Sequence, residues 1–248
     1  MPGRLQLLAR RLLAQLQSAL PALPSSCALC GVTADAALCA DCERQFFHGQ
    51  TARCGQCALP LPQTNGIKTR CGACLQQSPA FDATIVATDY SAPIDQLVLA
   101  LKFGGQLALA PLFARLLRDA LLQDQRQKLP TLLVAVPLGA QRLRSRGFNQ
   151  ALEIARPLTA SLGITLATRL VLREKETAAQ ALLHPRERQH NMQDAFCLAA
   201  DADVRGQHVG VVDDVITTGA TLNALAALLK HHGAARVTNL VFARTLPK

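Results

Sequence analysis

The fold of this chain is decided by one stretch, Val209-Gly210-Val211-Val212-Asp213-Asp214-Val215-Ile216-Thr217-Thr218-Gly219-Ala220-Thr221. Its apolar first half predicts a buried parallel strand, because residues on both faces of the strand are hydrophobic. Asp213 and Asp214 are expected at the carboxyl end of that strand, where open α/β sheets bind their ligands. A helix is expected to open near Leu222. The stretch therefore predicts an α/β domain with a ligand site at this strand end.

The residue types at this strand end indicate which ligand is bound. Asp213 and Asp214 are acceptor-only groups, suited to vicinal hydroxyls such as those of a ribose. The loop that follows offers hydroxyls, backbone N–H groups and a helix N-terminus to a phosphate. The phosphate is expected on Thr217, Thr218, Gly219, Ala220 and Thr221. Together these groups predict a pentose 5-phosphate site; the alternative is an ordinary strand and N-capped helix with solvated aspartates.

Composition sets limits on the class of protein. The chain has 248 residues, of which 50% are hydrophobic and 17% charged, as in a globular protein with one ordinary domain and a smaller one. The formal charge of +9 favours anionic partners, either phosphorylated small molecules or nucleic acid. With no Trp and one Tyr, stacking of single-stranded bases would rest on Arg, Lys and a few Phe.

Eight of the nine cysteines fall into four Cys-x-x-Cys pairs. Each pair can place two thiolates on one ion, and two pairs complete a closed tetrahedral site of the kind that holds structural zinc. Up to two zinc ions are therefore expected, with the pairs combined either in sequence or crossed. The expected ligands are Cys27, Cys30, Cys39, Cys42, Cys54, Cys57, Cys71 and Cys74.

The N-terminal segment Arg4–Leu20 is predicted to form an amphipathic helix that packs on the protein or on a partner. Arg10 and Arg11 interrupt its apolar stretch, which argues against an export signal. No segment approaches the length that spans a bilayer. We therefore expect a cytoplasmic protein without a membrane span.

After residue 78 the sequence alternates strand and helix patterns, which predicts a doubly wound parallel sheet. The expected domains are residues 1–78, with the N-terminal helix and the cysteine pairs, and residues 79–248. The expected strands beside the opening stretch are Ala83–Thr88, Leu132–Val136, Leu166–Leu172 and Val237–Phe242. The expected helices are Ile94–Phe103, Leu107–Leu122, a helix opened by Gly147-Phe148-Asn149-Gln150 that runs to about Leu162, and Leu222–His231.

Two basic segments are candidates for binding phosphate. Arg142, Arg144 and Arg146 are expected in a loop, either as a solvated turn or beside a pyrophosphate, whose oxygens match guanidinium groups. The charged segment that begins at Arg173 and includes Lys175 suggests a lid over the site, or an exposed helix and loop.

Several motifs together carry a resemblance to a known family. They are the four Cys-x-x-Cys pairs, Leu-Lys-Phe-Gly at 101–104, Arg-x-Arg-Gly-Phe-Asn-Gln at 144–150, Arg-x-Lys-x-Thr-x-x-Gln at 173–180, and the Val209–Thr221 stretch. The last resembles the loop of type I phosphoribosyltransferases that binds 5-phosphoribosyl-1-diphosphate (PRPP). The whole pattern resembles the ComF/GntX family, competence proteins with a double zinc ribbon and a phosphoribosyltransferase-like domain.

The resemblance implies a role for each candidate residue. Asp213 and Asp214 would hold the ribose and act in catalysis, and the Thr217–Thr221 loop would hold the 5-phosphate. The leaving diphosphate would lie on Val136, Pro137, Leu138, Arg142, Arg144, Arg146, Arg173 and Lys175. Mg²⁺ would arrive with PRPP, bound largely through the oxygens of the substrate.

The resemblance also implies partners: single-stranded DNA, and other competence proteins such as a DNA-uptake helicase or channel. Three hypotheses follow. The chain is a Mg²⁺-dependent transferase acting on an unknown acceptor, a non-catalytic DNA-binding factor that senses PRPP, or a zinc-stabilised scaffold that contacts partners through Arg4–Leu20.

Overall fold

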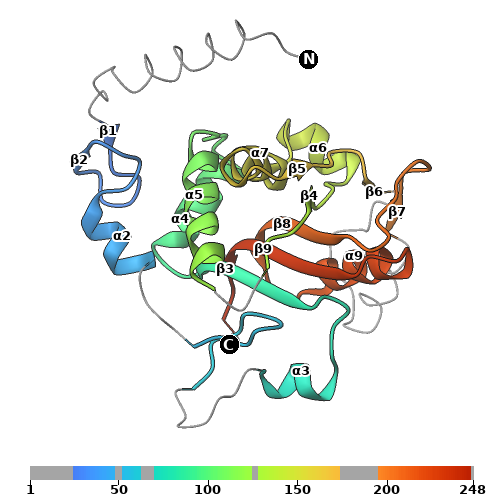
Figure 1. Cartoon of the computed structure of the whole chain (residues 1–248). Helices are drawn as coiled ribbons and strands as arrows, with labels where there is room; N and C mark the ends of the chain where they lie inside the picture. The colour runs from blue at the N-terminus through green and yellow to red at the C-terminus, as the bar shows by residue number, and fades with distance from the viewer. Residues whose placement is uncertain (1–24, 48–51, 63–69, 125–127, 174–194, 247–248) are drawn as a thin grey trace, which may run out of the picture. The chain divides into compact units, whose positions relative to one another are not determined.

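The computed structural model describes residues 25–47, 52–62, 70–124, 128–173 and 195–246 (Figure 1). The chain divides into two compact units, Met1–Glu43 and Arg44–Lys248. In the first unit, β1 (Ser25–Ser26) pairs with β2 (Thr33–Ala34), and helix α2 (Ala40–Phe47) begins. The predicted helix at 4–20 lies outside the described residues, and the predicted domain boundary at residue 78 stays a prediction.

The second unit is built on a five-stranded sheet in which all four strand pairs are parallel. The strands lie in the order β3 (Ala83–Asp89), β9 (Arg236–Arg244), β8 (His208–Ile216), β4 (Leu132–Ala135) and β5 (Thr165–Leu166). The predicted parallel α/β sheet is confirmed. The apolar first half of the opening stretch lies in β8, the central strand, and residues 209–212 are all buried.

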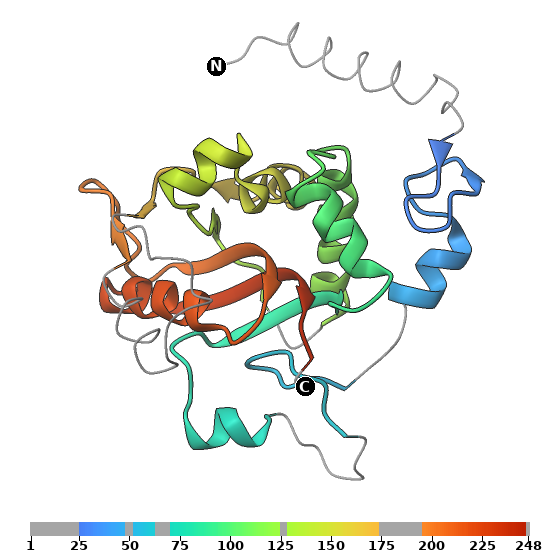
Figure 2. The ribbon, with the colours of Figure 1, turned by 180° about the vertical axis from the view of Figure 1, so that it is seen from behind.

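Helices cover both faces of this sheet, as Figures 1 and 2 show. On one face lie α5 (Leu109–Gln123) and α7 (Gln150–Leu162), and the ring of Phe113 stacks on Phe242 of β9 with 3.6 Å between the ring centroids. On the other face, α9 (Ala220–His231) packs with Val211 and Val241. Burial on both faces explains why β8 and β9 are continuously apolar.

Two segments differ from the sequence prediction. The 166–172 segment, predicted as one strand, turns after β5, and its end forms β6 (Val171–Arg173), which pairs antiparallel with β7 (Phe196–Leu198) outside the main sheet. The basic segment predicted as a loop forms a short helix, α6 (Ala140–Arg146). Its Ala, Gln, Leu and Arg residues favour a helix, and Gly147 ends it with a φ of +83°.

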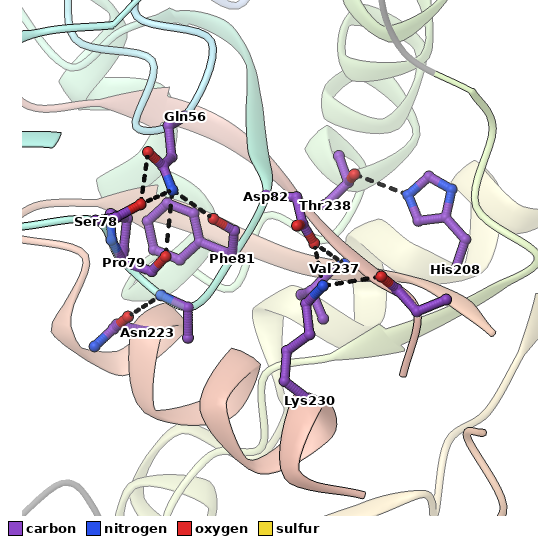
Figure 3. A network of polar contacts seen from close by, with 12 residues as sticks. Gln56, Ser78, Pro79, Phe81, Asp82, His208, Asn223, Lys230, Val237 and Thr238 are labelled. Atoms are coloured by element: carbon purple, nitrogen blue, oxygen red, sulfur yellow. Dashed lines mark hydrogen bonds and ion pairs between the residues drawn. The ribbon is translucent and has the colours of Figure 1, made fainter. Parts of the chain in front are cut away.

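Hydrogen bonds of Gln56, between Cys54 and Cys57, join the second cysteine cluster to the segment that leads into β3 (Figure 3). Gln56 is 3% exposed, and its Nε2 donates to Ser78 Oγ at 2.9 Å and to the carbonyl oxygens of Pro79 and Phe81 at 3.2 and 3.1 Å. The Thr84 hydroxyl of β3 donates to the Gln56 carbonyl at 2.7 Å. The knuckle thus fixes the segment that enters the first strand of the sheet.

None of the helices in the described residues combines the length and the hydrophobicity that crossing a bilayer requires.

Candidate functional site

The two aspartates of the opening stretch lie within β8, which continues to Ile216. The prediction that the strand ends at the aspartates was therefore wrong by two residues, because Val215 and Ile216 still pair with β9. Asp214 is 3% exposed, and its Oδ2 lies 2.6 Å from Nζ of Lys102, the last residue of α4 (Ile94–Lys102). Asp213 is half-buried, and its Oδ1 accepts a hydrogen bond from the Asp214 amide at 2.9 Å.

The local electrostatics leave this pair of carboxylates short of positive charge. The pKa of Asp213 is raised well above its usual range, chiefly by burial and secondly by the negative charge of Asp214. The Asp214 amide and the charge of Lys102 oppose this shift. One ammonium group thus faces two adjacent carboxyls. Hydroxyl donors or a divalent cation at Asp213 would stabilise its charged form, which fits a sugar ligand that arrives with a metal ion.

The predicted phosphate loop follows directly and opens α9. Gly219 is the N-cap residue, adopts a φ of +81° and contributes no capping side chain. Thr217 and Thr218 are exposed, and Arg244 of β9 donates a hydrogen bond to the Thr217 carbonyl oxygen. Arg244 thus fixes the loop through the Thr217 carbonyl oxygen. The N-terminus of the twelve-residue helix α9 follows the loop, and its free backbone N–H groups can bind a phosphate.

Cationic side chains from two helices approach the aspartates. Besides Lys102, α6 contributes Arg146, which is half-buried and lies close enough to Asp214 to feel its charge. Burial lowers the pKa of Arg146, Asp214 opposes that change, and Arg142 adds to it. Arg142 and Arg144 are exposed on α6. Of the predicted arginine trio, the structure thus brings Arg146 to the aspartates and places the other two on the helix surface.

The predicted diphosphate loop lies on the next strand. The Val136 amide donates to the Val212 carbonyl at 3.0 Å, and Asn149 Nδ2 donates to the Val136 carbonyl at 3.0 Å. Val136 is buried, and Pro137 and Leu138 are half-buried. A Cβ atom on Gly139 would lie 3.7 Å from Nε of Arg173, so the structure brings Arg173 to this loop. Lys175 lies outside the described residues.

The eight paired cysteines form two clusters. One contains Cys27, Cys30, Cys39 and Cys42, and the other Cys54, Cys57, Cys71 and Cys74, with the four sulfur atoms of each cluster within 4.8 Å of one another. The structure thus combines the pairs in sequence. The Cys30–Cys39 and Cys57–Cys71 sulfur distances are 3.7 and 3.6 Å, close to the separation of about 3.8 Å in a zinc tetrahedron with 2.3 Å bonds.

The acidity of the thiols also fits a metal site. Burial raises the pKa of Cys54, but backbone N–H groups of Cys57, Cys71 and Gln56 outweigh it and lower that pKa to about 7. Burial and the Cys54 charge contribute to a pKa of about 11 for Cys57. Four neighbouring thiols cannot all ionise without a cation, which a zinc ion supplies.

A phosphoribosyl transferase domain model matches residues 143–246, and a double zinc ribbon domain model matches residues 20–75. The DNA utilization protein YhgH of Salmonella typhimurium is 36% identical over 212 residues, which cover 84% of this chain and 91% of that protein. Competence protein F of Haemophilus influenzae is 34% identical over 200 residues, covering 79% of this chain and 85% of that protein. This chain belongs to the ComF family.

A more distant ComF relative is the competence protein ComFC of Streptococcus pneumoniae, 24% identical over 213 residues, which cover 85% of this chain and 89% of that protein. Family membership identifies the two cysteine clusters as the double zinc ribbon, whose zinc is structural. It also identifies the five-stranded parallel sheet as that of a type I phosphoribosyltransferase domain.

Sequence reasoning missed two residues of this site in the ComF chain. Lys102 pairs with Asp214, and Asn149 ties the 136–139 loop to α7, where its Oδ1 also accepts from the Ala151 amide at 3.0 Å. Both belong to motifs that support the family resemblance, Leu-Lys-Phe-Gly at 101–104 and Arg-Gly-Phe-Asn-Gln at 146–150. The motifs of the family resemblance therefore contained both residues, but residue spacing could not show tertiary contacts between separate segments of the chain.

Proposed function

We propose that this ComF protein binds PRPP and transfers its phosphoribosyl group to an acceptor. The observation that carries the proposal is the placement of Asp213 and Asp214 immediately before the loop at the start of α9, opposite Lys102 and Arg146. The site thus offers carboxylates for the ribose hydroxyls, a helix N-terminus for the 5-phosphate and cations for the diphosphate, which are the three parts of PRPP.

In the proposed reaction the bond between C1 of the ribose and the diphosphate oxygen breaks, and the acceptor forms a new bond to C1. The diphosphate leaves with the electron pair of the broken bond. Asp213 and Asp214 stabilise the positive charge that develops on the ribose in the transition state. The diphosphate is held by the 136–138 loop with Arg146 and Arg173, and the sequence makes Arg142, Arg144 and Lys175 further candidates for this role.

Mg²⁺ is proposed to accompany PRPP. Two adjacent carboxyls of which one has a raised pKa, beside a single lysine, form a donor set that suits a divalent cation. When bound, the ion would neutralise part of the diphosphate charge, chiefly through the oxygens of the substrate.

Single-stranded DNA is a second proposed ligand, supported by the formal charge of +9 and by relatives named for DNA utilization and competence. A factor that senses PRPP and binds DNA without catalysis is the alternative function. Partner proteins such as a DNA-uptake helicase or channel, and a cytoplasmic location in which the thiols stay reduced, belong to the same proposal.

The test is to incubate the zinc-loaded protein with PRPP, Mg²⁺ and single-stranded DNA, or a panel of other acceptors, and to measure diphosphate release. The transferase proposal expects release that depends on an acceptor and disappears in Asp213→Asn. Tight PRPP binding without release across a broad panel would support the sensing alternative and refute the transferase.

A further inference from the structure

An aromatic ring lies beside the proposed PRPP site and is left largely uncovered. Among the large hydrophobic side chains that the structure describes, Phe103 is the most exposed, at 74%. A single exposed hydrophobic residue needs no explanation in itself. The position of Phe103 needs an explanation, because this residue directly follows Lys102, whose Nζ lies 2.6 Å from Asp214 Oδ2.

The backbone around Phe103 holds the ring at this place. Phe103 is the C-cap residue of α4, and its amide donates to the Leu99 carbonyl oxygen at 2.8 Å. A Cβ atom on Gly104 would lie 2.8 Å from the Ala100 carbonyl oxygen, and Gly105 adopts a φ of +63°. The chain turns away immediately after Phe103 through two positions that only glycine fills without strain.

A cationic side chain, that of Arg146, lies next to the Phe103 ring. The guanidinium carbon of Arg146 lies 5.2 Å from the centre of the Phe103 ring, within the range of a cation–π contact. Arg146 in turn feels the charges of Asp214 and Arg142, so ring, cation and carboxylates form one neighbourhood. Arg142 and Arg144 are exposed on the same helix, α6. Exposed aromatic faces among arginines are the arrangement by which proteins stack single-stranded bases.

We infer that Phe103 and Arg146 form a stacking platform for a nucleobase at the edge of the proposed PRPP site. The inference rests on the proposed function, since the platform lies next to the carboxylates assigned to the ribose. It gives the ligand of this site a chemical class: a planar nitrogen heterocycle, supplied either as a free base or nucleoside or as a base in a single DNA strand. The exposed arginines of α6 would contact the phosphates in the second case.

The absence of tryptophan from the sequence permits a direct test. Phe103→Trp places the only tryptophan on the platform, and Leu75→Trp places it at a comparably exposed position, 70%, in the second zinc ribbon. Each variant of the full-length, zinc-loaded protein is titrated with a thymine oligodeoxynucleotide, an abasic oligonucleotide of equal length, and nucleosides. We expect quenching of Phe103→Trp fluorescence by base-containing ligands only, and none in Leu75→Trp. Quenching by the oligonucleotide alone identifies a base in a strand, and quenching by nucleosides identifies a free base.

Affinity gives a second readout. Truncation in Phe103→Ala removes a stacking partner, so we expect base-containing ligands to bind roughly fivefold or more weakly, while Leu75→Ala binds them as the wild type does. Equal quenching by the abasic strand, unchanged affinity in Phe103→Ala, or failure of all base-containing ligands to bind would overturn the inference. Binding of PRPP to the wild-type protein, measured separately, reports on the proposed function alone.

Discussion

The ion pair of Lys102 and Asp214 is the contact on which the arrangement of the site most depends. The Asp214 side chain is 4% exposed and that of Lys102 21% exposed, so water screens the pair poorly. Removing the cation alone leaves a buried carboxylate without its partner, whereas removing both charges leaves none. The single and double losses should therefore differ.

We expect Lys102→Met to lower the free energy of unfolding by about 3 kcal/mol, measured by urea denaturation of the zinc-loaded protein. The double variant Lys102→Met with Asp214→Asn should recover most of that loss. Equal destabilisation of the single and double variants would show that the charge of Asp214 is compensated elsewhere.

His208, at the start of β8, gives the protein a pH-dependent stability. Its Nε2 is hydrogen-bonded to Thr238 Oγ1 at 2.8 Å (Figure 3), and burial, followed by the charge of Arg236, lowers its pKa below the ordinary 6.5. Below about pH 6.5 the unfolded chain therefore binds a proton that the folded chain does not. The stability that His208 contributes is complete above that pH and is lost as the pH falls toward its lowered pKa.

We expect His208→Gln to flatten the fall in urea midpoint between about pH 6.5 and 5 relative to the wild type. Zinc release at acid pH affects both proteins alike, so the difference between the two profiles isolates the histidine. Parallel profiles would contradict this assignment.

At the scale of elements, the second zinc ribbon is connected to the phosphate loop. Gln56 lies between two cysteine ligands and holds Ser78, Pro79 and Phe81 by hydrogen bonds. Within that segment the Ala80 amide donates at 2.7 Å to Oδ1 of Asn223, in the first turn of α9 (Figure 3). A Cβ on Gly219 would lie 3.8 Å from the Phe81 ring, so the segment also lies against the loop itself.

We expect Gln56→Ala and Asn223→Ala each to reduce the free energy of unfolding by about 1 to 3 kcal/mol, because each substitution leaves buried or partly buried polar groups without a hydrogen-bond partner. If the two contacts act through one segment, the double variant should lose less than the sum of the single losses. Strict additivity in urea unfolding would show that the ribbon and α9 are held independently.

The sequence predicted elements well where one pattern dominated and poorly where short segments competed. The apolar runs of β8 and β9 and the periodicity of α5 and α7 are long, and the structure confirms them. The 166–172 segment was misassigned because a turn divides it into strands of two and three residues. The Lys102–Asp214 pair could not be predicted from spacing, because tertiary packing alone brings α4 to β8.

At the scale of the whole molecule, the two zinc sites belong to different compact units. Cys27, Cys30, Cys39 and Cys42 lie in the Met1–Glu43 unit, and the other four paired cysteines lie in the unit that contains the sheet. Loss of zinc from the second site should therefore lower the stability of the phosphoribosyltransferase domain, and loss of zinc from the first site should lower it much less.

We expect the purified protein to release two zinc ions per chain on denaturation, since two four-sulfur clusters are present. Cys54→Ser with Cys57→Ser should lower the thermal midpoint of the sheet-containing unit by several degrees, roughly 2–4 °C for each kcal/mol lost. The matched change Cys27→Ser with Cys30→Ser should leave that midpoint nearly unchanged. An equal decrease in both variants would contradict the assignment of the two sites to separate units.

We propose that the end of β8 and the start of α9 bind PRPP, and calorimetric titration of the zinc-loaded protein with PRPP and Mg²⁺ measures this binding directly. Asp213→Asn is the informative variant, because burial already disfavours the charge of Asp213 and the fold should tolerate the amide. We predict saturable binding of PRPP to the wild-type protein and an affinity lowered at least tenfold, about 1.4 kcal/mol, in Asp213→Asn. Equal affinity in the two folded proteins, or no binding by the wild type, would show that PRPP is not bound through Asp213 at the end of β8.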